Sequence, residues 1–434
     1  MSTLLRLATA GSVDDGKSTL VGRLLHDTKS VLADQMDAVE RVSRDRGLAQ
    51  ADLALLTDGL RAEREQGITI DVAYRYFATA ARSFILADCP GHVQYTRNTV
   101  TGASTADAVL VLVDVRKGVL EQTRRHLAVA ALLRVPHVLV AVNKIDLVDY
   151  DEAVYCGVAK EVDELAAGLG LRDVRTVPVS ALAGDNIVDR SERTPWYDGP
   201  SVLELLEQLP AADDPRSDRF RLPVQLVLRP QAAALDAAHT DYRGYAGQIA
   251  AGVVRVGDPV VVLPGGGRTT IVAIDTADGE LAEAFAPRSV ALRLADQIDV
   301  ARGDLIAAVD DAPLPTRDLD GTICWLFDRD LVPGARVLVK HTTRTVQAVV
   351  RDVVGRLDLD TLDLQPTERL QLNDIGRVTL RLAAPLAVEE YVDHRRTGAF
   401  LVIDAHDGTT LAAGMVGDPL VARNPTDRAS LYSI

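Results

Sequence analysis

The stretch GSVDDGKST, residues 11–19, decides the fold of this chain. It follows the apolar run LLRLATA, residues 4–10, and a helical pattern begins after Lys17. The stretch fits G-x-x-x-x-G-K-[ST], a loop whose glycines let backbone N–H groups turn toward phosphate oxygens and whose following helix adds its positive N-terminus. Because the loop lies between a strand and a helix, we expect Lys17 to span the β- and γ-phosphates and Ser18 to ligate Mg²⁺.

Short apolar runs alternate with helical patterns from the start of the chain to about residue 210. The runs that predict buried strands are LLRLATA (4–10), SFILADC (83–89), AVLVLVDV (108–115), HVLVAVNK (137–144) and VRTVPVS (174–180). Between them, helices are predicted after Lys17 and over residues 121–133. This alternation predicts an α/β fold, with a parallel sheet covered by helices on both faces. Ligands bind such sheets at the carboxyl ends of the strands.

The pattern changes after a polar, proline-containing stretch at residues 210–223, which we interpret as a linker. Beyond it, alternating strands with Gly and Pro turns between them predict two small antiparallel β-barrels. The first set of strands includes RLPVQLVLRP and RTTIVAID, and the second set runs from about Thr322 to Ser433. We therefore predict a nucleotide-binding domain over residues 1–211, a β-barrel over 222–314 and a second β-barrel over 318–434.

The composition is that of a globular protein, with 434 residues, 47% hydrophobic and 25% charged. Its net charge of −15 argues against a broad nucleic-acid surface, which would need clustered Lys and Arg. No window approaches about 18 uninterrupted apolar residues and the N-terminus lacks an export pattern, so we expect no membrane segment and a cytoplasmic location. The dispersed Cys89, Cys156 and Cys324 have no metal-ligand spacing, which is typical of thiols in a reducing compartment.

The stretch Asp88-Cys-Pro-Gly-His92 ends the strand predicted over residues 83–89. An acid at a strand end can hold a water on Mg²⁺, and Gly91 lets a backbone N–H approach the γ-phosphate. An Asp-x-x-Gly pattern is also common in ordinary turns. Its position one strand after the phosphate loop is what makes Asp88 a candidate site residue.

The stretch Asn143-Lys-Ile-Asp146 ends the strand predicted over residues 137–144. Asp146 can accept hydrogen bonds from the N1–H and the exocyclic amine of guanine, whereas adenine offers neither donor in that arrangement. Asn143 can bond the base and tie down the phosphate loop, and the Lys144 stem can cover the ring. The pattern therefore favours GTP over ATP. Backbone N–H groups of Ser180-Ala-Leu, after the last predicted strand, would lie near the guanine O6.

Thr69, in REQGITID, is the candidate sensor of the γ-phosphate. Its hydroxyl could join the Mg²⁺ shell only when the third phosphate is present. The segment from about Ala33 to Gly67 is highly charged and helix-patterned, which suits an element that orders with nucleotide state. A plain solvated helix explains that charge equally well.

Taken in order, these motifs resemble those of the translation-factor class of GTPases, and within it the large subunit of bacterial sulfate adenylyltransferase, the CysN type. The resemblance covers nearly the whole chain. Elongation factors usually have His at the positions of Ser12 and Asp15. The stretches that carry the resemblance are GSVDDGKSTL, TDGLRAEREQGITIDVAYRYF, DCPGHVQYTRNTVTGAST and VRKGVLEQTRRH.

The resemblance implies a GTPase that pairs with a smaller subunit of the CysD type, which makes adenosine 5'-phosphosulfate and pyrophosphate from ATP and sulfate. The family couples this uphill step to GTP hydrolysis. The resemblance also implies that His92 is catalytic and orients the attacking water. Arg61 and Arg64 are candidate charge-stabilising arginines that no spacing selects.

The implied cofactors are GTP and Mg²⁺. The implied metal contacts are Ser18, Thr69 and, through a water, Asp88. The implied GTP site comprises Gly11, Asp14, Asp15, Gly16, Lys17, Ser18, Thr19, Asp88, Cys89, Pro90, Gly91, His92, Asn143, Lys144, Asp146, Ser180, Ala181 and Leu182.

Some relatives of this type are fused to an adenylyl-sulfate kinase with its own phosphate loop. No second such loop occurs in this sequence, so we expect no kinase here. No SGGxD-like pyrophosphate loop is found either, so we expect that the chain does not form the sulfate adduct alone. Two other functions stay open: a translation factor that delivers tRNA on the same fold, and a GTP-binding scaffold whose hydrolysis is incidental. The YTRN and DDGKS details favour the sulfate enzyme, with no nucleic-acid partner.

Overall fold

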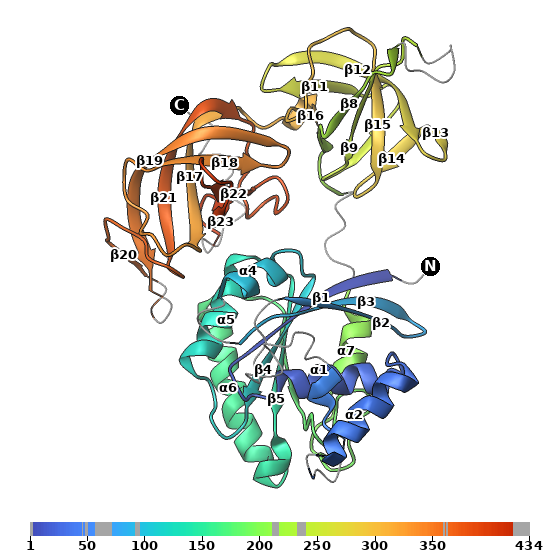
Figure 1. The fold of residues 1–434 in the computed structure, drawn as a ribbon, viewed down its shortest axis with the longest axis vertical. Coiled ribbons are helices and arrows are strands. Elements are labelled where there is room, and N and C mark those ends of the chain that lie inside the picture. The colour runs from blue at the N-terminus through green and yellow to red at the C-terminus, as the bar shows by residue number, and fades with distance from the viewer. Residues whose placement is uncertain are drawn as a thin grey trace. The chain divides into compact units, whose positions relative to one another are not determined.

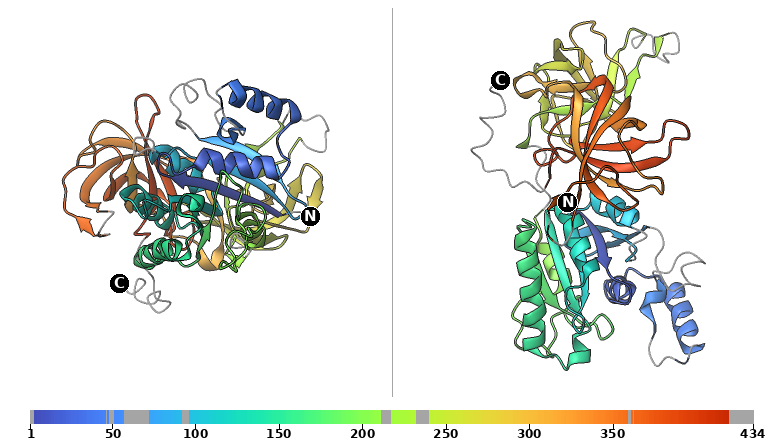
Figure 2. Two further views of the ribbon diagram at one scale, coloured as in Figure 1. Left: turned by 90° about the horizontal axis from the view of Figure 1, so that it is seen from below. Right: turned by 90° about the vertical axis from the view of Figure 1, so that its left-hand side faces the viewer.

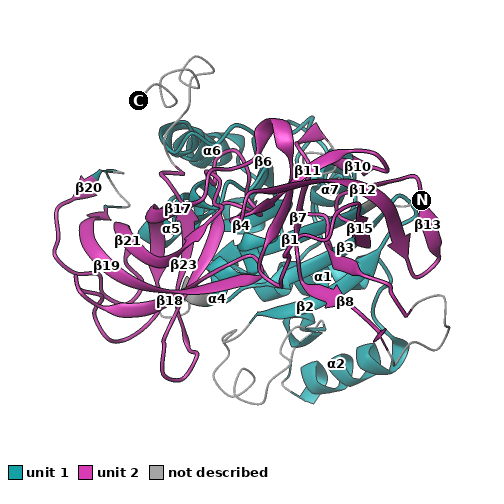
Figure 3. Ribbon diagram, turned by 90° about the horizontal axis from the view of Figure 1, so that it is seen from above, with its two compact units in different colours: residues 1–213, 358–363, 420–434 teal, residues 214–357, 364–419 magenta. Residues whose placement is uncertain are grey.

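The computed structural model describes residues 3–45, 47, 51–56, 72–91, 96–210, 217–231, 240–358, 361 and 363–419. The chain divides into two compact units, one built on residues 1–213 and the other on residues 214–357 and 364–419 (Figure 3). The three domain ranges expected from the sequence stay predictions. Part of the interpreted linker, residues 211–216, lies outside the described residues.

A six-stranded sheet forms the centre of the first unit (Figure 1). Its strands lie in the order β2 (Ala73–Ala78), β3 (Arg82–Asp88), β1 (Thr3–Gly11), β4 (Ala108–Asp114), β5 (His137–Asn143) and β6 (Val174–Pro178). From β3 to β6, every neighbouring pair is parallel. The predicted α/β sheet is confirmed, and the carboxyl ends of these strands meet at one edge.

Strand β2 differs from the others because it runs antiparallel to β3. Only residues 79–81 connect the two strands, and the Thr79 N–H donates to the Arg82 carbonyl at 2.8 Å to close the turn. A parallel pair needs a crossover of about a dozen residues or more, so this short connection allows only an antiparallel pair. The sheet is therefore mixed, where the sequence pattern predicted a parallel one.

Helices cover both faces of this sheet. The described helices are α1 (Lys17–Asp27), α2 (Ala33–Asp45), α4 (Thr96–Ser104), α5 (Glu121–Leu132), α6 (Glu152–Gly168) and α7 (Val202–Gln208), with 3₁₀ turns η1 (Leu53–Leu56) and η3 (Ile145–Val148). In Figure 2, α5 and α6 lie on the opposite side of the sheet from α1. None of these described helices is both long and apolar enough to span a lipid bilayer.

Burial explains why the central strands are so apolar. Every residue of β4 and β5 is buried, as expected for parallel strands that are covered on both faces. On one face, Leu20 and Leu24 of α1 and Leu206 of α7 share a buried cluster with Leu110 and Leu112 of β4. This packing fixes α1, and with it the loop that precedes it, on the sheet.

The second unit begins with an antiparallel sheet in the order β7, β16, β11, β12, β15, β9 and β8, with β13 added on β12. Only residues 224 and 225 separate β7 from β8, and Arg221 bridges to Ala251, so the two ends of the sheet meet. A separate pair is formed by β10 and β14. These strands are β7 (Arg221–Pro223), β8 (Leu226–Leu228), β9 (Gly244–Gln248), β10 (Val253–Arg255), β11 (Pro259–Leu263), β12 (Gly267–Thr276), β13 (Gly279–Leu281), β14 (Glu283–Phe285), β15 (Ser289–Leu294) and β16 (Leu305–Ala308).

The rest of this unit contains a closed antiparallel barrel, which confirms the prediction from the alternating pattern. Strand β18 pairs with both β22 and β19, which closes the ring β18, β22, β23, β17, β21 and β19, and β20 extends β19. Burial along β19 alternates almost residue by residue, because one face lines the barrel core. These strands are β17 (Thr316–Trp325), β18 (Arg336–His341), β19 (Arg344–Leu357), β20 (Leu364–Gln365), β21 (Ile375–Leu386), β22 (Ala399–Ile403) and β23 (Thr410–Val416), preceded by the 3₁₀ turn η7 (Val309–Asp311).

A buried ion pair joins these two β-domains. Arg221 of β7 is 1% exposed, and its Nη2 and Nε donate to Glu389 Oε1, beyond β21, at 2.8 and 3.0 Å. The carbonyls of Phe220 and Asp311 accept from the same guanidinium, and the Thr397 hydroxyl donates to the other Glu389 oxygen. A buried charge is costly unless it is paired and hydrogen-bonded. This ion pair therefore holds the segment after β21 against β7.

We predict that Arg221→Met destabilises the chain by about 3 kcal/mol, because it leaves the Glu389 carboxylate buried without its cation. The matched control is Arg255→Met in the same unit, since the Arg255–Glu283 pair is 2.9 Å long but 60% and 50% exposed. An exposed pair contributes about 1 kcal/mol or less. Denaturant unfolding measures both free energies, and equal losses would contradict the account.

Candidate functional site

The predicted motifs lie at the carboxyl ends of the parallel strands. The phosphate loop (Gly11–Ser18) follows β1, Asp88 ends β3, Asn143 ends β5 and Ser180 follows β6. Because β3, β1, β4, β5 and β6 are neighbours in that order, these segments share one edge of the sheet. The structure thus brings together the described motifs that the sequence singled out.

The phosphate loop takes a backbone conformation that its residue types explain. Asp14 and Gly16 have φ angles of 67° and 92°, in the left-handed region that glycine adopts most easily. Glycine is needed at position 16 for a second reason, because a Cβ there would collide with the side-chain amide of Asn143. The loop is closed by Asp15, whose Oδ2 accepts from the Ser12 N–H at 3.0 Å. Burial raises the pKa of the Asp15 carboxyl, and that hydrogen bond opposes the rise.

The side chain of Asn143 connects two loops. Its Nδ2 donates to the Asp15 carbonyl at 2.7 Å, and its Oδ1 accepts from the Ala181 N–H at 2.9 Å. Asn143 is 1% exposed, so these bonds satisfy a buried amide. The tie to the phosphate loop was expected from the sequence. The Ala181 N–H was expected to face the guanine O6, but here it donates to Asn143.

The neighbouring Lys144 is anchored by an acid that the sequence reasoning missed. Its Nζ lies 3.0 Å from Asp114 Oδ2 and also donates to the Asp14 carbonyl in the phosphate loop. Arg116 donates to both oxygens of Asp114 at 3.0 and 2.7 Å. Burial of Asp114 opposes its ionisation, but the hydrogen bonds from Arg116 and Lys144 outweigh that cost, so the pKa of Asp114 lies well below its ordinary value. The signal was present, because Asp114 ends an apolar strand as Asp88 does.

Asp88 and Lys17 bring opposite charges to the floor of the loop. The Thr9 hydroxyl donates to Asp88 Oδ1 at 2.8 Å across the β1–β3 pair, which orients the carboxylate. Lys17 is 7% exposed, and burial lowers the pKa of its ammonium while the charge of Asp88 opposes the fall. At Gly91 a Cβ would collide with the Gly11 carbonyl, so the chain after β3 packs directly on the phosphate loop.

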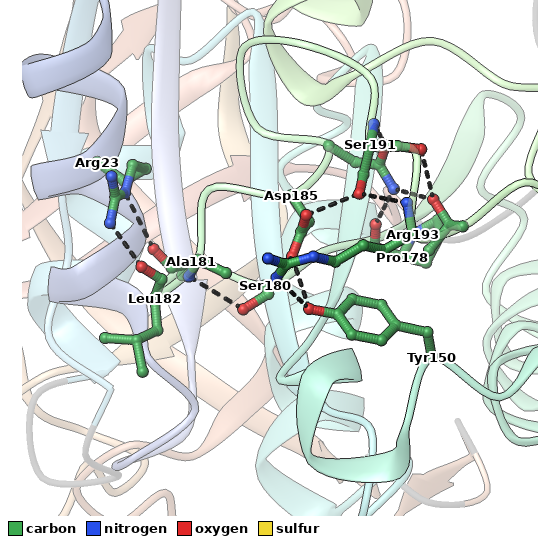
Figure 4. Close-up of polar contacts among 12 residues, drawn as sticks. Arg23, Tyr150, Pro178, Ser180, Ala181, Leu182, Asp185, Ser191 and Arg193 are labelled. Carbon is green, nitrogen blue, oxygen red and sulfur yellow. Dashed lines mark hydrogen bonds and ion pairs between the residues drawn. The ribbon is translucent and has the colours of Figure 1, made fainter.

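Residues 180–185, the base loop, form a tight turn after β6. The Gly184 N–H donates to the Ser180 carbonyl at 2.8 Å, and the Ser180 N–H donates to the Asp185 carbonyl at 3.2 Å. The Asp185 carboxylate accepts from Tyr150 Oη at 2.9 Å and from Ser191 Oγ at 2.7 Å (Figure 4). These bonds hold the end of the base loop against η3 and the chain that follows.

His126 is a second residue that the sequence reasoning did not select. It lies on α5 and is 3% exposed, with its ring close to the Gly11 backbone and its Nε2 3.4 Å from Gln122 Nε2. Burial, with the nearby charge of Lys17, lowers the pKa of His126 to about 3. The imidazole is therefore neutral at physiological pH, and it packs against the start of the phosphate loop from α5.

The remaining predicted residues are placed as follows. Ser18 and Thr19 lie in the first turn of α1, Cys89 and Pro90 are buried after β3, Asp146 is half-buried in η3, and Leu182 is exposed. Burial raises the pKa of the Cys89 thiol to about 12, so it stays protonated. Thr69, His92, Arg61 and Arg64 lie outside the described residues. Within the described ranges, no group of three or more His, Cys, Asp or Glu side chains could hold a metal ion.

Comparison with known proteins identifies the family. The Elongation factor Tu GTP binding domain matches residues 2–215, and the GTP-eEF1A C-terminal domain-like family matches residues 318–417. Sulfate adenylyltransferase subunit 1 of Cellvibrio japonicus is 46% identical over 425 residues, which are 98% of this chain and 88% of that protein. This chain belongs to the sulfate adenylyltransferase subunit 1 family. The predicted resemblance is confirmed.

Two further matches extend the comparison. The bifunctional enzyme CysN/CysC of Mycobacterium tuberculosis is 54% identical over 428 residues, which are 98% of this chain and 69% of that protein. Among solved structures, sup35 complexed with GDP matches with 24% identity and a TM-score of 0.42, over 96% of this chain and 94% of that one.

We predict that Asp114→Asn weakens GTP binding about tenfold, because Lys144 loses the carboxylate that holds it against the phosphate loop. The matched control is Asp173→Asn, which removes a carboxylate paired with His137 and Arg175 just before β6, at the opposite end of the strand from the base loop. Titration calorimetry compares the two variants with the wild type. Equal losses would show that Asp114 has no special role.

The same variant gives a pH test. Because the pKa of Asp114 is depressed in the folded chain, its contribution to stability is present above the ordinary Asp pKa of about 3.9 and is lost as pH falls below it. The difference in unfolding free energy between wild type and Asp114→Asn should therefore be constant near neutrality and shrink only in acid. A difference in unfolding free energy that disappears between about pH 8 and about pH 6 would contradict this account.

Proposed function

We propose that this chain is the GTPase subunit of a sulfate adenylyltransferase. In that role it couples GTP hydrolysis to the formation of adenosine 5'-phosphosulfate and pyrophosphate from ATP and sulfate. The observation that carries the proposal is its identity of 46% and 47%, over 98% of this chain, to relatives named sulfate adenylyltransferase subunit 1.

The nucleotide of the first unit is GTP, in keeping with the GTP-binding family that matches it. We assign the guanine N1–H and exocyclic amine to Asp146, which is half-buried in η3. A purine without those donors would leave this carboxylate unpaired, which is how such a site rejects ATP. The Lys144 stem covers the ring while its Nζ stays on Asp114. The base loop supplies a backbone N–H group toward O6.

The phosphates lie in the phosphate loop, over the N-terminus of α1. Lys17, buried beside the charge of Asp88, contacts the β- and γ-phosphates. The buried Ser12 hydroxyl has no hydrogen-bond partner in the part of the chain that the structure describes, which fits a loop built to receive polar atoms. Asn143, at the end of β5, ties the loop down through the Asp15 carbonyl, and His126 of α5 packs close to it.

Mg²⁺ is the metal that we propose for this site. Ser18 and Asp88 offer a hydroxyl and a carboxylate, and oxygen ligands of this kind suit Mg²⁺, which keeps part of its water shell. We assign Ser18 and Thr69 as direct ligands and Asp88 as a ligand through water. Bound magnesium would neutralise charge that develops on the phosphates. The Thr9 hydrogen bond keeps the Asp88 carboxylate oriented for this role.

His92 is the residue that we propose to orient the attacking water. The phosphoryl-transfer transition state is loose, so a histidine has to position the water rather than remove its proton completely. Gly91 packs against the Gly11 carbonyl, so the chain that leads into His92 starts beside the phosphate loop.

A second subunit completes the enzyme. The relatives' name, subunit 1, supports the existence of a partner, and we propose a small subunit of the CysD type that binds ATP and sulfate. We also propose a cytoplasmic location, where the free thiols of Cys89, Cys156 and Cys324 would stay reduced. A translation-factor function would use the same fold, but these relatives, which match over 98% of this chain, carry the sulfate name.

The proposal is tested by mixing the chain with a CysD-type subunit, ATP, sulfate and GTP, and measuring pyrophosphate release. We predict that release rises severalfold with GTP. His92→Ala should slow GTP turnover about 100-fold and abolish the stimulation, because the attacking water is no longer oriented. Its affinity for GTP should stay within a few fold of the wild type.

Two results would contradict the proposal. Pyrophosphate release that ignores GTP would remove the coupling, and retention of aminoacyl-tRNA with no effect of sulfate would favour the translation-factor function. A His92→Ala variant that loses GTP affinity together with turnover would remove the water-positioning role from His92.

A further inference from the structure

Arg23 connects the helix of the phosphate loop to the base loop. It lies on α1, nearly two helix turns beyond Lys17, and its guanidinium points at the base loop (Figure 4). Its Nε donates to the Ala181 carbonyl at 3.3 Å, and its Nη2 donates to the Leu182 carbonyl at 2.5 Å. The planar guanidinium group therefore holds two successive carbonyl groups of the base loop.

The guanidinium is itself held in place. Asp27, one turn further along α1, lies 3.7 Å from Arg23 Nη1 and also contacts His26 at 2.7 Å. The Arg23 side chain is 19% exposed, so its hydrogen bonds are only partly open to competition from water. The contact is thus an ordered link between two parts of the site, rather than a long side chain lying on the surface.

The direction of the two carbonyls fixes the direction of the amides. In a trans peptide the C=O and the following N–H point to opposite sides. Because the Ala181 carbonyl points at Arg23, the Leu182 N–H points away from it. The Ala181 N–H is already used by Asn143, and the Ala183 N–H donates to Ser180 Oγ at 3.2 Å. Arg23 thus orients the amides of Leu182 and Ala183, and because the Ala183 N–H is already used within the loop, that of Leu182 is the one left for a ligand.

We propose that Arg23 is a positioning residue for base specificity: by holding the Ala181 and Leu182 carbonyls, it turns the Leu182 N–H toward the 6-oxo group of the purine. This inference rests on the proposed GTP site. It adds a second element of base selection, in addition to Asp146, which addresses the N1–H and the exocyclic amine. It also couples the two halves of the site, since α1 carries both Lys17 and Arg23.

The test separates the 6-oxo contact from the others by using three nucleotides. GTP and inosine triphosphate both carry the 6-oxo group, whereas 2-aminopurine riboside triphosphate lacks it. We predict that Arg23→Ala weakens the first two about tenfold and changes the third by less than about twofold, because only the first two use the positioned amide. Titration calorimetry on the full chain gives the three affinities.

The controls keep the test decisive. Arg175→Ala removes a partly exposed arginine that donates to Asp173 next to β6, and it should leave all three affinities unchanged. If Arg23→Ala folds poorly, Arg23→Gln takes its place in the test. Its side-chain amide keeps one donor group, so it should show the same pattern among the three nucleotides with a smaller loss of affinity. Equal losses for all three nucleotides, or no loss for any, would overturn the inference.

Failure of this inference and failure of the proposed function give different results. If wild type prefers GTP to ATP and Arg23→Ala behaves like wild type, only the role of Arg23 is lost. If wild type does not prefer GTP, the proposed GTP site is wrong and this inference falls with it.

Discussion

One buried carboxamide, that of Asn143, donates to the Asp15 carbonyl at 2.7 Å and accepts from the Ala181 N–H at 2.9 Å. The phosphate loop and the base loop come from strands that are not neighbours, and this side chain fixes their separation. The constraint reaches the sequence, because a residue larger than glycine at position 16 would collide with the same amide. The two loops and Asn143 thus form a rigid frame, and a ligand that spans both loops has to fit the fixed distance between them.

The charged groups around these two loops also hold the site in a fixed shape. Asp114 holds Lys144 on the phosphate loop, and Thr9 orients Asp88 beside the buried Lys17. A neutral His126 supports the loop without adding a further positive charge. The arrangement places one cation and one carboxylate together at the phosphate loop.

The sequence predicted what is local and missed what depends on distant pairs. The phosphate loop and the motifs at residues 88–91 and 143–146 are contiguous, and each follows an apolar strand, so pattern and position were enough. Arg23 contacts a carbonyl 158 residues away, and Arg221 contacts an acid 168 residues away, and no spacing reveals either pair. Asp114 could have been found by the rule that selected Asp88. The direction of β2 depends on a three-residue turn, which the alternation of strands and helices does not register.

The central claim is that Asn143 holds a guanine-specific frame, and a calorimetric titration of GTP and ATP into wild type and Asn143→Ala tests it most directly. The account predicts that wild type binds GTP at least about 100-fold more tightly than ATP. It also predicts that Asn143→Ala loses most of its GTP affinity, because the two loops are no longer held at a fixed separation. Wild type that takes up ATP as tightly as GTP, or a variant with unchanged GTP affinity, would contradict it.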